Sequence, residues 1–572
     1  MLSLLPMLVM AQDGQLTITT DSVNQLSRLL PDSVRFTMSD LKVLGPINGN
    51  DLRIIKLIAA HVTVRKPVER VLKTLDLSEA ILSESKGMFR TSSESFPAAM
   101  FVNSKTLEKV ILPESMTAIS KSCFSGCINL KDIQLPTNLD VIDDNAFLNC
   151  SSLKSIELPP MLTRIENHAF DGCVSLEEIT VPQTVCVIDN YAFARCTSMQ
   201  KAVIDCAVTR IGSNAFTGCE QLRALELPQS VNLIGEEAFK GCTTLETIVM
   251  PENITAIDNS AFEGCANLRR MKLGVANKIG NNVFKGCSNL ISVVIESCSS
   301  IGKNAFEGCQ SLATVNIDGN IQEIADETFI GCANLMNIIL PNTVKNIGKK
   351  AFADCKSLTV FDLPSSTTRI LEMAFKDCTS LKKIVIPNLV KRLGQSAFEN
   401  CASLDTVNIQ GFIEEIEFAT FRFCHSLRFV ILPISIKGIG DNAFEECSLL
   451  EDIKLPISVA YIGENAYNKC LSLRTMNVPA ACKDIGSSAF RECTSLVRVV
   501  FPAALQKIGG NAFAKCVSLQ EVVCQSPIPP AITHSTFKGV VLPACKVIVP
   551  IGAHKNFQAD KNWRKLPQII ER

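Results

Sequence analysis

The chain has 572 residues, of which 47% are hydrophobic and 20% are charged, a balance typical of a folded protein rather than a disordered one. Its 56 basic and 57 acidic residues nearly cancel, whereas a nucleic-acid or anionic-membrane surface would need a basic patch. No apolar run reaches the roughly 18–20 residues that cross a bilayer. We therefore expect no nucleic-acid partner and no membrane span.

Residues 1–11 are predicted to be a signal peptide. Leu2–Met10 is an apolar stretch, and Val9–Ala11 fits a small-residue cleavage site before Gln12. No Lys or Arg precedes the stretch, so either the start is assigned too late or the signal is a weak one. The alternative is a frayed apolar N-terminus. We favour export, to the cell surface or the medium, with the periplasm as the other destination.

Residues 12–100 lack the repeat described below and are predicted to form an N-terminal cap of degenerate repeats. Two irregular strands are expected, in the segments beginning at Leu41 and Leu72. A helix from about Asp51 to Ala60 is expected between them, with Asn50 as its N-cap.

Residues 101–524 carry a repeat built on the phrase Phe-x-x-Cys-x-x-Leu, as in "NAFEGCQSL". Eighteen consecutive units contain it, and fifteen of the seventeen spacings between their cysteines are 23 residues. Those cysteines are Cys127, Cys150, Cys173, Cys196, Cys219, Cys242, Cys265, Cys287, Cys309, Cys332, Cys355, Cys378, Cys401, Cys424, Cys447, Cys470, Cys493 and Cys516. A period this regular predicts a solenoid, in which stacked repeats share one continuous core.

One unit, "AFTGCEQLRALELPQSVNLIG", shows the structural role expected for each position of the repeat. Leu225 and Leu227 lie two residues apart and so point to the same side of a short strand. Pro228 lacks a backbone donor and is expected to end that strand, and thirteen units have Pro at this position. Ile234 is expected to return to the interior, and Gly235 to permit a turn.

Residues 525–572 depart from the 23-residue period and are predicted to form a C-terminal cap. Phe537 lacks the cysteine that follows it elsewhere, and the single tryptophan, Trp563, is expected to lie over the last open repeat.

The unit Leu-x-x-Ile-x-Leu-Pro-x-x-Val-x-x-Ile-Gly-x-x-Ala-Phe-x-x-Cys resembles the BspA-like leucine-rich repeat family, in its 23-residue repeat class. The resemblance covers roughly Phe101 to Cys524. It implies a leucine-rich repeat horseshoe or arc with a parallel β-sheet on the concave face. It also implies a secreted or surface protein of an anaerobic bacterium, with a role in adhesion or protein binding.

The repeated cysteine allows four interpretations. Zinc sites usually contain a C-x-x-C pair, which this chain lacks. A nucleophile needs a nearby base, and no histidine recurs with the repeat, although His425 follows Cys424. Disulfides between neighbouring repeats are the more serious competitor in an exported protein. We favour buried free thiols, because the neighbouring Phe and Leu are core residues. We therefore expect no enzyme activity, cofactor or metal site.

The outward-facing strand positions are the candidate binding surface. Several are apolar where water is expected, in the repeats from Asn337 to Ile431. The candidate residues are Asn337, Ile339, Val360, Asp362, Lys383, Val385, Phe429 and Ile431. The alternative is that β-branched residues simply suit strands, which accounts for Val and Ile but poorly for Phe429.

Two functions remain open. The first is a secreted or surface module that binds a protein of a host or neighbouring cell through its concave face. A glycan is the other ligand considered, although one Trp and three Tyr offer few aromatic platforms. The second is a passive structural or coat component. A coat protein should self-associate, and for the binding module we expect a monomer.

Overall fold

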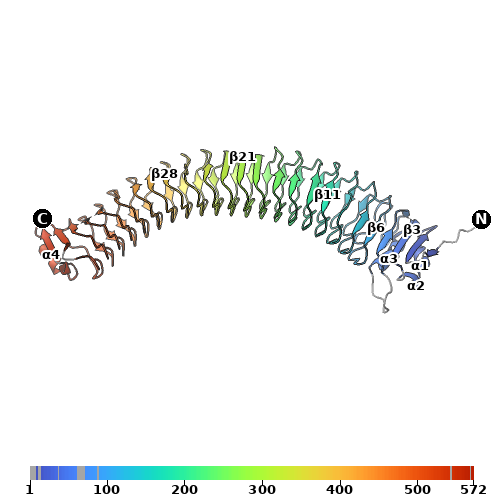
Figure 1. The fold of residues 1–572 in the computed structure, drawn as a ribbon, viewed down its shortest axis with the longest axis horizontal. Coiled ribbons are helices and arrows are strands. Elements are labelled where there is room, and N and C mark those ends of the chain that lie inside the picture. Colours follow the sequence, from blue (N-terminus) through green and yellow to red (C-terminus); the bar gives the residue numbers. More distant parts are fainter. Residues whose placement is uncertain are drawn as a thin grey trace, which may run out of the picture. The chain divides into compact units, whose positions relative to one another are not determined.

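The computed structural model describes residues 8–10 (backbone only), 14–35, 38–60, 71–86, 89–541, 544–566 and 568–572. It divides into unit 1 (Met1–Leu290) and unit 2 (Ile291–Arg572), and each is described by itself. In both units the chain winds as a parallel β-solenoid, with one turn for each sequence repeat (Figure 1). The predicted solenoid is confirmed.

Unit 1 begins with the degenerate turns. Its first elements are β1 (Leu8–Met10), β2 (Gln15–Thr19), α1 (Leu26–Leu29), α2 (Asp32–Arg35), β3 (Asp40–Ile47), α3 (Gly49–Ala59), β4 (Thr74–Asp76) and β5 (Ala80–Leu82). Strands β2, β3 and β4 are parallel, and β4 pairs with the first regular strand. Strand β1 is antiparallel to β2. Residues 1–7 and 11 of the proposed signal peptide lie outside the described residues, so that assignment stays a prediction, as do the boundaries at residues 100 and 524.

The predicted helix is present, but its predicted N-cap is wrong. Asn48, not Asn50, caps α3: its Oδ1 accepts hydrogen bonds from the backbone N–H groups of Asn50 and Asp51 at 3.0 and 3.4 Å. The Asp51 carboxylate accepts in return from the N–H of Asn48, which completes a capping box. The same carboxylate accepts from the backbone of Asn24 and Leu26, so a tertiary contact fixes the start of the helix.

The regular turns of unit 1 form two ladders of strands, to which all but one contribute both a longer and a shorter strand. The longer strands are β6 (Lys109–Ile111), β8 (Asp132–Gln134), β11 (Glu178–Val181), β13 (Lys201–Ile204), β15 (Ala224–Glu226), β17 (Thr247–Val249) and β19 (Arg270–Val275). The shorter are β7 (Ala118–Ile119), β9 (Val141–Ile142), β10 (Arg164–Ile165), β12 (Val187–Ile188), β14 (Arg210–Ile211), β16 (Leu233–Ile234), β18 (Ala256–Ile257) and β20 (Lys278–Ile279). Only the long-strand ladder was predicted.

Unit 2 repeats this arrangement. Its longer strands are β21 (Ser292–Cys298), β23 (Thr314–Gly319), β25 (Asn337–Ile339), β28 (Lys383–Ile386), β30 (Thr406–Ile409), β32 (Phe429–Ile431), β35 (Thr475–Asn477), β37 (Arg498–Phe501), β39 (Glu521–Cys524), β40 (Lys546–Val549) and β41 (Gln568–Glu571). Its shorter strands are β22 (Ser300–Ile301), β24 (Glu323–Ile324), β26 (Asn346–Ile347), β27 (Arg369–Ile370), β29 (Arg392–Leu393), β31 (Glu415–Ile416), β33 (Gly438–Ile439), β34 (Tyr461–Ile462), β36 (Asp484–Ile485) and β38 (Lys507–Ile508).

Proline limits the length of the longer strands. Strands that a proline follows have three or four residues, such as β15 before Pro228 and β11 before Pro182. Without the proline, β13 and β30 also have four, but β19, β21 and β23 extend to six or seven. The prediction that proline ends the strand is therefore confirmed. Three turns have no long strand in the ladder, at residues 155–158, 360–363 and 452–455, although the short-strand ladder continues past each of them.

The third side of each turn carries the Phe and Cys of the repeat. In unit 1 the rings from Phe101 to Phe284 stack at centroid distances of 5.2–5.5 Å. In unit 2 the rings from Phe306 to Phe537 stack at 5.1–5.7 Å. These columns are fully buried for most of their length and form the side of the core away from the longer strands.

Two left-handed residues bend this third side. In "NAFEGC" they are Asn304, at φ 56°, and Gly308, at φ 70°. Asn and Gly are the residues that adopt this region most readily, which explains their recurrence in the phrase. Gly235 directly precedes the turn that begins at Glu236. Its φ is not left-handed, but an added Cβ would lie 2.7 Å from the backbone nitrogen of Ser213. It permits the close approach of the preceding turn.

The C-terminal cap ends in α4 (His554–Ala559), the 3-10 helix η2 (Trp563–Lys565) and β41. Trp563 is fully buried, with its ring 5.9 Å from Phe537, the last member of the phenylalanine column. Its indole N–H donates to the carbonyl of Pro530 at 2.7 Å. Trp563 thus covers the end of the column, as predicted. Among the described residues, no helix has the length and hydrophobicity that crossing a membrane requires.

Candidate binding surface

The repeated cysteines are packing groups. All eighteen are buried. Sixteen have their Sγ placed to donate to the carbonyl of the phenylalanine in the preceding repeat, as Cys150 does to Phe124 at 3.1 Å, and Cys493 donates to the carbonyl of Tyr467, which replaces that phenylalanine. Burial raises the pKa of Cys173 and Cys242 to about 12, which disfavours the reactive thiolate. The predicted burial is confirmed, and Cys186 is the exposed cysteine of the chain.

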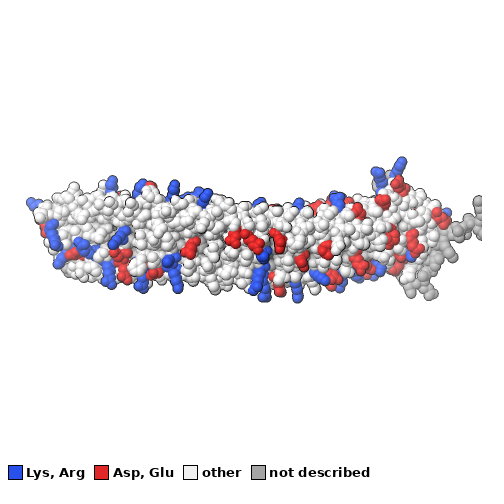
Figure 2. Space-filling model, turned by 90° about the horizontal axis from the view of Figure 1, so that it is seen from above, with Lys and Arg blue, Asp and Glu red and all other residues white. Residues whose placement is uncertain are grey.

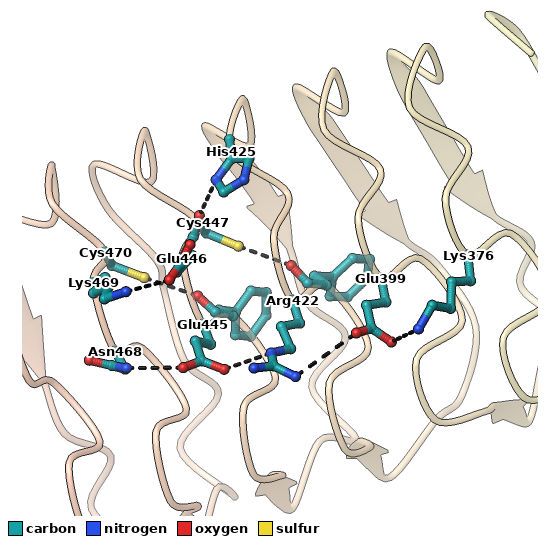
Figure 3. A network of polar contacts seen from close by, with 12 residues as sticks. Lys376, Glu399, Arg422, His425, Glu445, Glu446, Cys447, Asn468, Lys469 and Cys470 are labelled. Atoms are coloured by element: carbon teal, nitrogen blue, oxygen red, sulfur yellow. Dashed lines mark hydrogen bonds and ion pairs between the residues drawn. The ribbon is translucent and has the colours of Figure 1, made fainter. Parts of the chain in front are cut away.

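The structure separates the candidate pair Cys424 and His425. The Cys424 thiol is buried and donates to the carbonyl of Phe398 at 3.2 Å, whereas His425 is exposed. The Nδ1 of His425 lies 3.0 Å from the carbonyl oxygen of Glu446, in the next repeat (Figure 3). Among the described residues, no group of three or more His, Cys, Asp or Glu side chains is placed to hold a metal ion. The geometry offers no base to activate this thiol.

A row of alternating charges follows the phenylalanine column in unit 2 (Figure 3). Glu399 lies between Lys376 and Arg422, at 3.0 and 4.0 Å, and Arg422 forms an ion pair with Glu445 at 2.7 Å. Asn468 donates to the other oxygen of Glu445 at 3.0 Å. Because Glu399 and Glu445 are buried and each charge faces one of opposite sign, this row holds neighbouring turns in register rather than offering a ligand site.

The predicted surface residues all lie exposed on the long-strand face of unit 2. Ile339 is 67% exposed, Val360 56%, Phe429 61% and Ile431 57%. Asn337 and Ile339 lie on β25, and Val360 and Asp362 lie in the turn that has no strand. Their exposure is confirmed, and their role in binding stays a prediction.

Three strands bring the remaining candidates together. In the sheet β28–β30–β32, Lys383 is in register with Thr406 and Thr406 with Phe429, while Val385, Asn408 and Ile431 form the second row. The backbone ladder fixes these side chains before any ligand arrives, so binding would cost little ordering of the protein. This sheet is bordered by the two strandless turns of unit 2, at residues 360–363 and 452–455.

A shallow hollow of about 310 Å³ lies beside β28, where the first of these turns leaves a gap in the ladder. Two predicted residues, Asp362 and Val385, contribute to its lining, together with Ser365, Asn388 and Gln410. The hollow has an acidic and a polar side, so it suits one polar side chain of a larger ligand better than a small apolar molecule.

Four exposed apolar residues near this sheet were not predicted. They lie just past the strand-ending position of four consecutive repeats: Leu389 and Phe412 two residues beyond it, and Ile434 and Ile457 one residue beyond it. A signal was present in the sequence: the residue after the strand-ending proline is polar in most units, as at Gln229 and Glu252, but is Ile at 434 and 457. The prediction considered strand positions alone.

Charge is mixed over the surface. Figure 2 shows acidic and basic side chains interspersed along one face of the described residues, with no broad field of one sign there. Many of these charges pair between neighbouring turns, as Lys109 does with Asp132 at 2.7 Å and Lys437 with Glu414 at 2.7 Å. Such exposed pairs contribute little to stability.

The two ladders, the buried phenylalanine and cysteine columns and the capped ends define this chain as a leucine-rich repeat solenoid. Residues 85–200, 187–313, 299–428 and 414–540 match the BspA type Leucine rich repeat region. Because these matches cover most of the sequence, the chain belongs to the BspA-type leucine-rich repeat family.

A solved structure shares this fold, and others show partial similarity. A leucine-rich repeat protein from Bacteroides ovatus is 24% identical with a TM-score of 0.52, over 75% of this chain and 98% of that one. A leucine rich cell surface protein from Faecalibacterium prausnitzii is 24% identical over 53% of this chain and 87% of that one, with a TM-score of 0.35. A leucine rich repeat protein from T. pallidum is 30% identical over 32% and 77%, with a TM-score of 0.26. No curated protein sequence matches the chain.

Proposed function

We propose that this protein is a non-enzymatic binding scaffold, secreted or held at the cell surface, that takes a protein ligand on the long-strand face of unit 2. The observation that supports the proposal most is the exposure of Phe429 and Ile431 on a hydrogen-bonded sheet, at 61% and 57%. Large apolar side chains on a rigid frame are the usual anchors of protein interfaces. The family, and the description of the Faecalibacterium relative as a cell surface protein, support the location.

A protein ligand fits this face better than a glycan. Sugar rings are usually bound by several exposed aromatic platforms, but Trp563 and Tyr467 are fully buried, and Tyr461, 38% exposed, lies on the short strand β34. The proposed face itself offers one exposed aromatic ring, that of Phe429. The face instead combines aliphatic anchors with Lys383 and Asp362, a mixture typical of the centre and rim of a protein interface.

The experiment compares two variants of the full chain in a pull-down from cell-surface extracts, with each captured protein then titrated in purified form. Phe429→Ala with Ile431→Ala should weaken binding at least tenfold, because two central anchors are removed. Val249→Ala is the matched control, since Val249 is 51% exposed at the corresponding position of β17. Unchanged affinity of the double variant, or an equal loss in the control, would refute the proposed face.

A passive structural role is the second candidate. It is favoured by the apolar residues in the turns after the strands, which suit lateral contacts between copies. A coat would form open-ended assemblies, whereas the binding scaffold should remain a small, closed species.

A further inference from the structure

An apolar stripe runs along one edge of unit 2, and it consists of Leu389, Phe412, Ile434 and Ile457. One residue comes from each of four consecutive turns: Leu389 and Phe412 stand two residues past the strand-ending position, and Ile434 and Ile457 stand one residue past it. Their exposed fractions are 52%, 66%, 88% and 81%. The proposed ligand-binding face does not include them.

The turns that carry the stripe are fixed to one another. The Ser435 hydroxyl donates to the carbonyl of Ile413 at 2.7 Å, and the Ser458 hydroxyl lies within 2.9 Å of the carbonyls of Ile434 and Ile436. Ile413 and Ile436 are themselves buried directly beneath the turns. The stripe therefore has one side chain on each of four stacked turns, which lie roughly 4.8 Å apart as neighbouring strands do. Its position within the turn shifts by one residue between Phe412 and Ile434.

The size of the stripe approaches that of one side of a protein interface. At roughly 200 Å² for a large apolar side chain, the four exposed fractions leave on the order of 550 Å² of apolar surface. This area is near the upper end of the largest apolar patch that a typical monomer exposes, and such patches are often functional. A standard interface covers about 800 Å² on each partner, so the stripe and a polar rim would suffice.

We propose that the occupant of this stripe is a second copy of the same chain, packed antiparallel about a two-fold axis. The axis would lie across the stripe between the turns of Phe412 and Ile434. It places Phe412 against Ile434 of the second copy, and Leu389 against Ile457 of the second copy. Because both rows belong to the same solenoid, their spacings match by symmetry, which no unrelated partner would guarantee.

Glu414 and Lys437, the charged residues beside the stripe, are placed so that the same two-fold axis pairs opposite charges. Glu414 follows Phe412 and Lys437 follows Ile434, each just beyond the buried residue of its turn. The two side chains form an ion pair with each other within the chain at 2.7 Å, and each remains 62% exposed and open to a further charge. The axis that brings Phe412 to Ile434 therefore brings Glu414 to Lys437 of the second copy, and the reverse pair forms at the other end. This self-complementarity is what an isologous interface requires.

The contact closes on itself and produces a dimer rather than a coat. It replaces the expectation of a monomer and rests on residues other than those of the proposed ligand face. Loss of ligand binding in the Phe429→Ala, Ile431→Ala variant would leave the dimer intact, so the two proposals fail separately.

The first test is sedimentation equilibrium of the full chain, with the concentration raised to about 100 µM. The wild type should dimerise, and Ile434→Glu with Ile457→Glu should raise the dissociation constant at least a hundredfold. Ile551→Glu is the matched control, because Ile551 is 84% exposed in a turn outside the stripe. A wild type that stays monomeric, or a double variant that dimerises like the control, would overturn the proposal.

The second test uses charge reversal. Glu414→Lys alone and Lys437→Glu alone each create two like-charged contacts in the dimer, so each should weaken dimerisation about tenfold. An equimolar mixture of the two variants restores both opposite pairs across the interface, although the pair within each chain stays broken. Recovery of the wild-type dissociation constant on mixing is expected, and no recovery would rule out the two-fold arrangement.

Discussion

Raising the pH from 8 to 10 should unfold this solenoid through its buried thiols. Burial raises the pKa of Cys173 and Cys242 in the folded chain to about 12, whereas an unfolded cysteine titrates near 8.5. Below about pH 8.5 both states keep the proton, and the full stability is present. Above it the unfolded chain alone loses protons, so the free energy of unfolding falls as the pH rises toward the folded pKa.

The magnitude is large because every repeat contributes. One pH unit costs about 1.4 kcal/mol for each buried thiol, so at pH 10 each turn loses about 2 kcal/mol. A segment of four turns loses about 8 kcal/mol, which is comparable to the whole stability of an ordinary domain. Lysines interfere little in this range, because ion pairing raises the pKa of Lys303 and Lys469 further above their usual value.

The assay is urea denaturation followed by far-ultraviolet circular dichroism at pH 8, 9 and 10, with a reductant present. The control is Cys401→Ala with Cys424→Ala, which removes two neighbouring thiols. This variant should be less stable at pH 8, but its stability should fall by about 2.7 kcal/mol less per pH unit than that of the parent. An unchanged urea midpoint between pH 8 and 10, or equal slopes for the two proteins, would refute the reasoning.

Three further predictions concern single positions. A thiol reagent added to the native protein at pH 7.5 should label Cys186 rapidly and the repeated cysteines only after denaturation, as counted by mass spectrometry; rapid labelling of most of them would contradict the packing role. Tyr467→Phe should raise the free energy of unfolding by about 1 kcal/mol in urea titrations, because the Tyr467 hydroxyl is buried without a hydrogen-bond partner. Gly235→Ala should lower it by about 2 kcal/mol, since the new Cβ would lie 2.7 Å from the backbone of Ser213; an unchanged melting temperature would show that the turns can separate there.

The sequence predicted those parts of the fold that recur with the period. Leu225 and Leu227 are two residues apart, and this alternation indicated the longer strand before its register was known. The shorter strands have only two residues, such as Leu233–Ile234, which is too few for any alternation to show. Their ladder arises from stacking, so it became visible only when neighbouring turns were placed together.

The helix cap shows a different limit. Asn48 and Asn50 are equally good cap residues by type, and the choice depends on Asp51. That carboxylate is held by the backbone of Asn24 and Leu26, more than twenty residues away in sequence. No local pattern carries such information.

The candidate surface was predicted in part. Alternation placed Phe429 and Ile431 outward because strands have a simple two-residue period. Turns have no such period, so Ile434 and Ile457 could be found only by comparing equivalent positions across repeats. Whether an exposed side chain binds anything depends on a partner, and that information lies outside the chain's own pattern.

The hydrogen bonds that the cysteine thiols donate favour changes in the length of the array by whole repeats. Most of the repeated cysteines, such as Cys150 and Cys401, donate to the phenylalanine carbonyl of the turn before them, so the donor and acceptor of each such bond belong to different copies of the motif. Excising 23 residues between two equivalent points, for example between Cys378 and Cys401, therefore joins a donor to an acceptor of the same kind. Recombination between such segments can lengthen or shorten the gene by whole motifs. Each remaining turn then still has an equivalent turn on either side. A deletion of half a motif would leave both a donor and a phenylalanine ring without their counterparts, and selection should remove it.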